Sequence, residues 1–558
     1  MKKSRLLMAV LGVLAILVPT ACSTLPQDGE PHEFAIEAPQ RDPVRQFGSA
    51  PQAGSSPTLL VEDFLRATAA GMYDDFATAR LYLQPEASAT WRPNLQVAVF
   101  PSDFSPSPEL KDRQGEEAQV SLSLTTIGTV NEAGVLSASV SPGSVSTEFT
   151  LTLNEDGEWR IAGLADGVIL SQSAFTSAYQ SVNLLFPSTD LSGLVPDPRW
   201  YPRSRVAAYL VQGLIDGPVE SLVPAVVGDL AADLSLPTAG VEVQDRVATV
   251  DLEGNASASE AERSALIWQI SETVTQVASV QSVEIRLNGV ELDESDIPTG
   301  PAYRLDRAVG LIDGAVVIGS TSLSTEVANA ATVGANALNP ALGPVDEAPV
   351  AWVNSEPGRL AVMSLGSPEP RDIPMPGATA PSIDRFGVVW VSSPNLPNAV
   401  WAVAPGRDPV QVSVPFDGEI VKVTVSPDGS RALLLTRDGR GSRVQLATVR
   451  RNDTEAQYGL ESVSEVDLFS SDIEDLTWIG ETTIATLAPG TDTEATIEVF
   501  SLGGWMQVLS APPKVSRITA GATLGSLLVQ RSDGTAFQRA GAAWIELDDA
   551  AQQISFAG

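Results

Sequence analysis

The stretch TVSPDGSRALLLT, residues 424–436, places a tight turn before a short apolar strand. Its proline presets the backbone for a turn, and its glycine accepts a positive φ. The same order recurs in SIDRFGVVWVSS from residue 382, LTWIGETTIATLA from residue 476 and ITAGATLGSLLVQ from residue 518. Spacings of about 40 to 50 residues are typical of propeller blades. We therefore predict an all-β propeller over residues 301–558, with roughly five to seven blades, and a β-sandwich pair is the alternative.

Helical and hairpin patterns precede this region and predict an α/β unit over residues 171–300. An amphipathic helix is expected over residues 203–216, since its apolar side chains share one face and it stops at Gly217-Pro218. A second helix follows Ser259, which forms a capping box with Glu262. Its buried stripe consists of Leu266, Ile270, Val274 and Val277. The Asn288-Gly289 dipeptide between alternating apolar residues predicts a tight hairpin.

The region 58–170 begins with helix-like periodicity and continues with strand-like alternation. Two helices separated near Gly71 are expected first. Alternating apolar residues then lead through Asp156-Gly157 into Trp159, which is the pattern of a β-hairpin. Helices followed by antiparallel strands favour a small α+β roll. The whole chain is therefore expected to be multidomain.

The N-terminal segment has the features of an export signal. Positive charges precede an apolar run and a small-residue exit, so residues 1–21 are predicted to be a signal peptide. Cys22 follows at once, as the lipidated cysteine does in a bacterial lipobox, although Pro19 stands where an aliphatic residue is usual. The alternative is a plain secretory signal cut after Ala21. Residues 22–57 are rich in Pro, Gly and Ser and are predicted to be a flexible tether.

The composition excludes several classes of function. Asp and Glu number 69 against 34 Lys and Arg, giving a net charge of −35, so nucleic acid is a poor partner. The sole cysteine is Cys22 and the sole histidine, His32, lies in the tether. Catalysis by Ser/His/Asp or Cys/His groups and zinc sites with nitrogen or sulfur ligands are thereby excluded from the folded body. We predict no enzyme activity, no catalytic residues, no metal and no cofactor.

Three weaker patterns have ordinary structural explanations. Paired carboxylates facing a pocket would suit a glycosidase, but no spacing in the sequence selects a pair. Asp428 lies in a turn, where an aspartate usually accepts hydrogen bonds from the backbone. Propeller tryptophans would stack on sugars or fill the blade cores. These residues are Trp352, Trp390, Trp401, Trp478, Trp505 and Trp544.

One short segment is a candidate contact for a partner protein. Arg199, Trp200, Tyr201 and Arg203 lie between prolines, and aromatic residues and arginines are enriched in interface hot spots. The alternative is that Trp200 and Tyr201 attach the following helix to its sheet.

The order of these segments resembles the LpqB family of actinobacterial lipoproteins. The resemblance is carried by NLLFPSTD, by VPDPRWYPRSRVAAYLVQGLIDGP, by ERSALIWQISETVTQV and by VEIRLNGVEL, which are similar to a GerMN domain. It is also carried by NEDGEWRIAGLADGVILS, which is similar to the end of that family's N-terminal domain.

The resemblance implies an accessory protein of the MtrA-MtrB two-component system. Such a protein would be held by the lipid on Cys22 at the outer face of the cell membrane. It would contact the extracytoplasmic region of an MtrB-like sensor histidine kinase and modulate signalling linked to cell-wall homeostasis and division. The alternative function is a lipoprotein that binds or cleaves cell-wall carbohydrate with its propeller.

Overall fold

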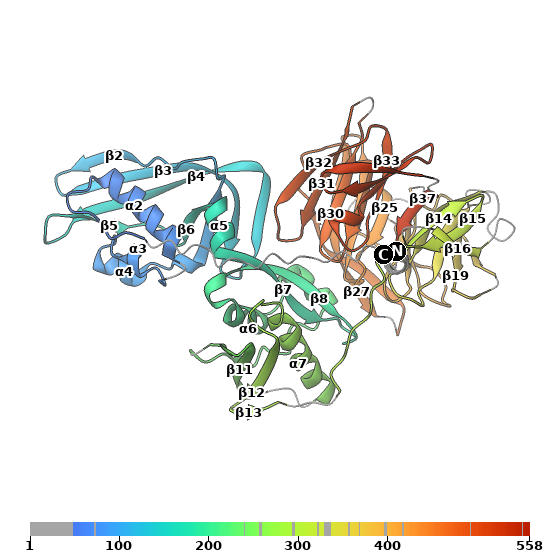
Figure 1. Ribbon diagram of the computed structural model, residues 1–558, viewed down its shortest axis with the longest axis horizontal. Coiled ribbons are helices and arrows are strands. Elements are labelled where there is room, and N and C mark those ends of the chain that lie inside the picture. The colour runs from blue at the N-terminus through green and yellow to red at the C-terminus, as the bar shows by residue number, and fades with distance from the viewer. Residues whose placement is uncertain are drawn as a thin grey trace, which may run out of the picture. The chain divides into compact units, whose positions relative to one another are not determined.

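The computed structural model describes most of residues 48–558 (Figure 1). The gaps are 72–73, 239, 256–258, 293–295, 321–322, 329–335, 355–357, 368, 395–398, 416–417, 453, 491–492 and 549–550. The predicted signal peptide, the predicted lipidation residue Cys22, His32 and the predicted tether up to residue 47 therefore lie outside the described residues. Three successive folded regions follow, and their elements are those expected of an α+β roll, an α/β unit and a propeller.

The first region packs helices against a six-stranded sheet in the order β5-β4-β3-β1-β6, with β2 pairing to β3. The helices are α2 (Pro57–Ala70), α3 (Ala77–Arg80), α4 (Pro85–Thr90) and α5 (Gln172–Ala178). The strands are β1 (Gln96–Phe100), β2 (Glu109–Gln114), β3 (Glu117–Asn131), β4 (Leu136–Leu153), β5 (Trp159–Gly163) and β6 (Val168–Ser171). The predicted hairpin joins β4 to β5, where Gly157 has a φ of 75°. Tyr82 Oη donates to Ser49 O at 2.8 Å, so residues before α2 also contact this region.

The second region contains a β-α-β unit. Helix α7 (Glu260–Val274) connects β11 (Val247–Gly254) to the parallel strand β12 (Ser282–Leu287). The remaining elements are β7 (Tyr179–Pro187), β8 (Leu194–Pro202), α6 (Val206–Asp216), β9 (Leu234–Ser235), β10 (Glu242–Gln244) and β13 (Val290–Glu291). Short 3-10 turns, Arg203–Arg205 and Glu220–Ala225, flank α6.

Local sequence signals of this region are confirmed. Ser259 Oγ accepts a hydrogen bond from the Glu262 amide at 3.4 Å and caps α7. The four predicted stripe residues of α7 and its continuation are all buried. Helix α6 ends at Gly217, whose φ is 88°. The β12–β13 turn uses Asn288 and Gly289 at φ values of 52° and 77°, as a tight hairpin requires.

Strand β8 forms despite prolines at 196, 198 and 202. It pairs only with β7, so one of its edges carries no ladder. On β7, the amides of Asn183 and Leu185 donate to side chains outside the pair, which places the partner residues Pro198 and Pro196 at non-hydrogen-bonded positions. Because prolines at every second residue face the unpaired edge, they remove no ladder hydrogen bond.

The described residues of the third region form six four-stranded antiparallel sheets, which are the six blades of a propeller. Blade one is ordered β16-β15-β14-β37, which places the last strand of the chain innermost. The innermost strands of neighbouring blades contact one another around the ring, and β37 contacts both β17 and β33. This arrangement replaces the alternative of two packed sheets.

The strands of blades one to three are β14 (Ala308–Ile312), β15 (Ala315–Gly319), β16 (Leu323–Ala328), β37 (Gln552–Phe556), β17 (Ala337–Leu342), β18 (Val350–Asn354), β19 (Arg359–Met363), β20 (Arg371–Pro374), β21 (Ser382–Ile383), β22 (Val389–Ser392), β23 (Ala399–Val403) and β24 (Val410–Ser413). Those of blades four to six are β25 (Glu419–Val425), β26 (Arg431–Asp438), β27 (Gly441–Asn452), β28 (Gln457–Glu465), β29 (Asp475–Ile479), β30 (Thr483–Ala488), β31 (Ala495–Ser501), β32 (Met506–Ala511), β33 (Val515–Thr519), β34 (Leu528–Arg531), β35 (Ala536–Ala540) and β36 (Ala543–Leu547). The four repeats seen in the sequence are the first two strands of blades three to six.

Candidate functional site

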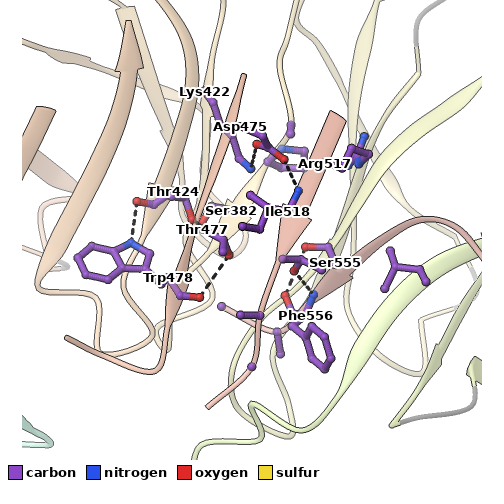
Figure 2. Close-up of a pocket in the computed structure, with 18 of the residues that line it drawn as sticks. Ser382, Lys422, Thr424, Asp475, Thr477, Trp478, Arg517, Ile518, Ser555 and Phe556 are labelled. Carbon is purple, nitrogen blue, oxygen red and sulfur yellow. Dashed lines mark hydrogen bonds and ion pairs between the residues drawn. The ribbon is translucent and has the colours of Figure 1, made fainter. Parts of the chain in front are cut away.

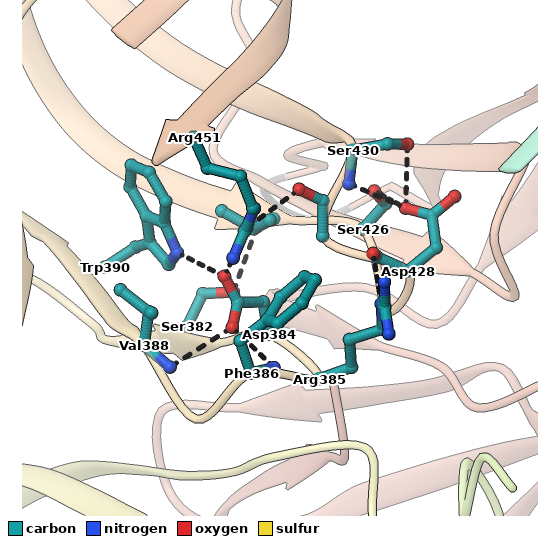
Figure 3. Close-up of polar contacts among 12 residues, drawn as sticks. Ser382, Asp384, Arg385, Phe386, Val388, Trp390, Ser426, Asp428, Ser430 and Arg451 are labelled. Atoms are coloured by element: carbon teal, nitrogen blue, oxygen red, sulfur yellow. Dashed lines mark hydrogen bonds and ion pairs between the residues drawn. The ribbon is translucent and has the colours of Figure 1, made fainter. Parts of the chain in front are cut away.

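Asp384, in the first turn of blade three, is fully buried and holds that turn together (Figure 3). Its Oδ1 accepts hydrogen bonds from the amides of Phe386 at 2.9 Å and Val388 at 3.1 Å. Its Oδ2 accepts from Trp390 Nε1 at 2.9 Å and from Arg451 Nη2 at 2.8 Å. With both oxygens engaged inside the fold, this carboxylate has a structural role.

Asp428 has the same role in blade four. Its Oδ1 accepts hydrogen bonds from the Ser426 hydroxyl and from the amide and hydroxyl of Ser430, at 2.9 and 2.8 Å for the latter two. Gly429 supplies the positive φ of the turn. Asp428 is therefore the backbone acceptor that its turn position predicts (Figure 3).

Glu481, in the corresponding turn of blade five, lies among charged groups. Burial raises its pKa to about 8, and the charge of Asp428 adds to the shift, whereas Arg431 and Arg385 oppose it. Burial also raises the pKa of Tyr303, and the charges of Asp428 and Glu481 add to that shift. Between pH 4.5 and about 8, the Glu481 carboxyl is therefore protonated in the folded protein and ionised in the unfolded chain.

This difference predicts a pH dependence of stability. Because the folded-state pKa lies above the unfolded one, the stabilisation is complete below pH 4.5 and is lost as the pH rises toward 8. The Glu481 side chain is half-buried, so we expect a loss on the order of 1–2 kcal/mol in the free energy of unfolding. Glu481→Gln should flatten the curve in denaturant titrations at pH 5 to 8.5. Substitution of an exposed glutamate, Glu546→Gln, serves as the control. If the unfolding free energy of Glu481→Gln fell with pH as steeply as that of the wild type, the assignment would be contradicted.

The centre of the propeller contains a narrow cavity of about 50 Å³, lined by the innermost strands (Figure 2). Lys422 Nζ pairs with Asp475 Oδ1 at 2.6 Å and donates to Leu476 O at 2.8 Å. Asp475 Oδ2 accepts from the Ile518 amide at 2.9 Å. Arg517 Nη1 donates to Asn339 Oδ1 at 2.7 Å. These polar groups come from blades two, four, five and six.

A wider pocket of about 590 Å³ shares Asn339, Lys422, Asp475 and Arg517 with this cavity. We call it the channel-mouth pocket. Its other polar or charged lining residues are Thr379, Arg437, Glu474, Ser516, Gln530, Arg531, Ser532, Gln552 and Gln553. The volume falls in the range of about 300–1,000 Å³ that is common for small-molecule sites.

Among the described residues that line them, neither cavity has the two carboxylates and tryptophan that the carbohydrate-cleaving alternative requires in one cleft. The narrow cavity has Trp478 and a single carboxylate, Asp475, and that carboxylate is paired to Lys422. The wider pocket has Glu474 and Asp475 but no aromatic residue. Trp478 is itself buried and donates from Nε1 to Thr424 O at 3.2 Å.

The other propeller tryptophans are also held by the fold. Trp352 and Trp390 are fully buried in blade cores. Trp401, Trp505 and Trp544 are partly buried and pack against hydrophobic clusters. Within the described residues, no group of three or more His, Cys, Asp or Glu side chains is arranged to hold a metal ion.

Two of the four predicted partner-contact residues lie inside the fold. Arg199 is 3% exposed and pairs with Asp197, which is equally buried, at 2.7 Å. Tyr201 is 5% exposed, and its ring stacks on Tyr209 of α6 with centroids 5.5 Å apart. For Tyr201 the structure therefore gives the alternative role, which is to attach α6 to β8.

Trp200 and Arg203 are partly exposed. Trp200 Nε1 donates to Gly503 O at 2.7 Å, and its ring lies 4.9 Å from that of Phe175. Arg203 donates to Gln180 Oε1 at 3.1 Å and to the main-chain carbonyl of Thr176. Contact with a partner protein stays a prediction for this segment, and only these two side chains are accessible for it.

The channel-mouth pocket is absent from the sequence-based predictions. Its cations stand singly, for example Lys422 in β25 and Arg517 in β33, and no motif surrounds them. A basic residue within the first strand of a blade would have indicated Lys422 and Arg517, because those strands line the channel. Arg437 and Arg531 lie at the ends of second strands and carry no such signal.

Three family models match the chain. The N-terminal domain of lipoprotein LpqB matches residues 50–176, a sporulation and spore germination domain matches residues 183–293, and the LpqB β-propeller domain matches residues 314–554. These ranges follow the three folded regions described above.

Curated relatives align along most of the chain. Lipoprotein LpqB of Nocardia farcinica is 27% identical, with 91% of this chain and 90% of the relative covered. Lipoprotein LpqB of Thermobifida fusca is 25% identical, with 85% and 86% covered. Among solved structures, TolB from Acinetobacter baumannii aligns with 12% identity and a TM-score of 0.36, over 70% of this chain and 90% of that one. Across the described residues, none of the helices has the length and apolar character needed to span a bilayer.

Proposed function

Because the chain belongs to the LpqB family of lipoproteins, we propose that it is a lipid-anchored accessory protein at the outer face of the cell membrane. In this proposal it binds the extracytoplasmic region of an MtrB-like sensor histidine kinase and modulates two-component signalling linked to cell-wall homeostasis and division. The observation that carries the proposal is similarity to lipoproteins over nearly the whole chain, combined with Cys22 directly after a signal-like segment.

The chemistry of the chain supports a binding role. The body between residues 48 and 558 has neither histidine nor cysteine, and the aspartates of its blade turns are engaged in the fold. Six blades give a rigid platform with many loops, which suits recognition of another protein. A net charge of −35 would repel an anionic lipid surface, so membrane attachment would depend on the lipid of Cys22.

Crosslinking in intact membranes tests the proposal. The wild-type chain is expected to capture a membrane histidine kinase, and Cys22→Ala to capture at least about tenfold less. The reason is that loss of the anchor lowers the effective concentration of the protein near the kinase. Ser23→Ala, which keeps the cysteine, is the matched control and should capture as wild type does.

Two results would refute the proposal in different ways. Equal capture by Cys22→Ala would show that the anchor has no part in binding. Failure of the wild type to capture any membrane protein would remove the accessory role itself. For the partly exposed part of the predicted contact, Arg203→Ala reports whether that surface takes part, since the hydrogen bonds of its side chain to described residues go to Gln180 and Thr176.

A further inference from the structure

The channel-mouth pocket has a charge opposite to that of the protein. Its lining includes four cationic side chains, Lys422, Arg437, Arg517 and Arg531, and two carboxylates, Glu474 and Asp475. The chain as a whole has about twice as many acidic as basic residues. A pocket with a local excess of cations in such a chain concentrates anions from solution.

Three of these four cations form no ion pair among the described residues. Lys422 is paired with Asp475 at 2.6 Å. Among the described residues, none of Arg437, Arg517 and Arg531 has a carboxylate oxygen within the 4.0 Å of an ion pair. In a chain so rich in carboxylates, three such arginines around one cavity leave guanidinium groups available to a ligand.

The pocket is also held in shape. The Arg517 guanidinium is oriented by Asn339 Oδ1, and the backbone N–H of Asn339 donates to Gln553 Oε1 at 2.6 Å. Asn339 and Gln553 both have a left-handed backbone, with φ values of 52° and 53°. Such conformations are costly for residues other than glycine and concentrate at binding sites. Arg531 is fixed by its hydrogen bond to Pro513 O at 3.0 Å.

Burial of Arg517 also favours binding of an anion. Removal from water lowers the pKa of this guanidinium, and the neighbouring charge of Asp475 opposes the shift. A partly desolvated cation gains more from a charged ligand than an exposed one does, because the surrounding dielectric is lower.

We propose that the channel-mouth pocket binds a small anion, in which a phosphate or carboxylate group is attached to a polar body of about the size of a sugar. Guanidinium groups match both oxyanions through paired N–H donors. The hydroxyl and amide side chains of Thr379, Ser516 and Gln552 line the rest of the pocket. None of the described residues that line it is aromatic, so a neutral sugar or a nucleobase finds no stacking surface among them.

This inference does not rest on the kinase proposal. The full mature chain can be tested in solution by isothermal titration, without a membrane or a partner. The probes are glucose 1-phosphate, glucuronate, inorganic phosphate and uncharged glucose. The two sugar anions are expected to bind, whereas glucose is not. Whichever of the two anions binds with the higher affinity shows whether phosphate or carboxylate is the preferred group. Affinity should fall as salt is raised from low to physiological ionic strength.

Variants locate the binding. Arg437→Gln and Arg517→Gln are each expected to lower the affinity for the anion about tenfold, because each substitution removes a charge-assisted contact. Arg440→Gln, on the same hairpin but outside the pocket lining, is the matched control and should change affinity less than about twofold. Arg437 is exposed, so Arg437→Gln remains informative if Arg517→Gln does not fold.

The proposal is overturned if none of the anions binds at millimolar concentration. It is equally overturned if anions bind but Arg437→Gln has no more effect than Arg440→Gln, or if glucose binds as tightly as its phosphate. Loss of kinase capture in the crosslinking experiment would leave all of these measurements unaffected.

Discussion

Asp384→Ala is expected to lower the free energy of unfolding of the propeller by about 3–5 kcal/mol. The carboxylate is fully buried and accepts hydrogen bonds from two amides, an indole and the Arg451 guanidinium. Its removal leaves the buried Arg451 side chain, which is 6% exposed, without its carboxylate. For a region of this size, the melting temperature should fall by on the order of 10 °C.

The control for this result is another aspartate that pairs with an arginine. Asp408 pairs with Arg371 at 2.9 Å, but its side chain is 98% exposed. Asp408→Ala is therefore expected to cost no more than about 1 kcal/mol. Similar melting temperatures for Asp384→Ala and Asp408→Ala would show that the blade-three turn does not depend on its buried carboxylate.

Arg199→Ala is expected to have the second large effect, again about 3–5 kcal/mol. Arg199 and Asp197 are both 3% exposed and share two hydrogen bonds, at 2.7 and 3.2 Å. Arg199 also donates to Ala133 O at 2.8 Å. Truncation would leave the Asp197 carboxylate buried with only the Val219 amide as a donor. Thermal unfolding of the purified chain measures the loss.

Arg203→Ala, four residues along the same segment, should change stability by less than about 1 kcal/mol, since its side chain is partly exposed. The pair of variants separates the two roles considered for this segment. If Arg199→Ala melted like wild type but captured less partner, Arg199 would be a surface contact and its buried pairing would be wrong.

The features that could be predicted from the sequence are those set by neighbours in the chain. The Asn288-Gly289 hairpin, the cap at Ser259 and the helix stop at Gly217 each depend on a few consecutive residues with special backbone preferences. The stripe on α7 follows from helical periodicity alone. The propeller was indicated because four of its blades repeat one turn-and-strand pattern.

The features that could not be predicted depend on distant parts of the chain. The number of blades can be counted only when the pairing of β37 with β14 is known, and these two strands are separated in the chain by most of the propeller. Strand β8 carries three prolines, which argue against a strand unless its unpaired edge is known. For Arg199 a local signal did exist, since Asp197 lies two residues earlier and side chains at that spacing share one face of a strand.

The candidate site is the hardest part to predict for the same reason. Its cations come from different blades: Lys422 and Arg437 from blade four, Arg517 and Arg531 from blade six. In the sequence they are isolated basic residues among many carboxylates. Only closure of the ring brings them to one cavity.

The position of β37 also has a consequence for the biogenesis of the protein. Blade one needs a strand from residues 552–556, which are the last of the propeller to be synthesised. Blades two to six consist of strands that are consecutive in the chain, so they can form in order as the chain is synthesised. Until residues 552–556 have been synthesised, the edge of β14 that pairs with β37 is unpaired. Until the final strand arrives, that edge presents unpaired N–H and C=O groups to other chains, so aggregation or chaperone binding would begin there.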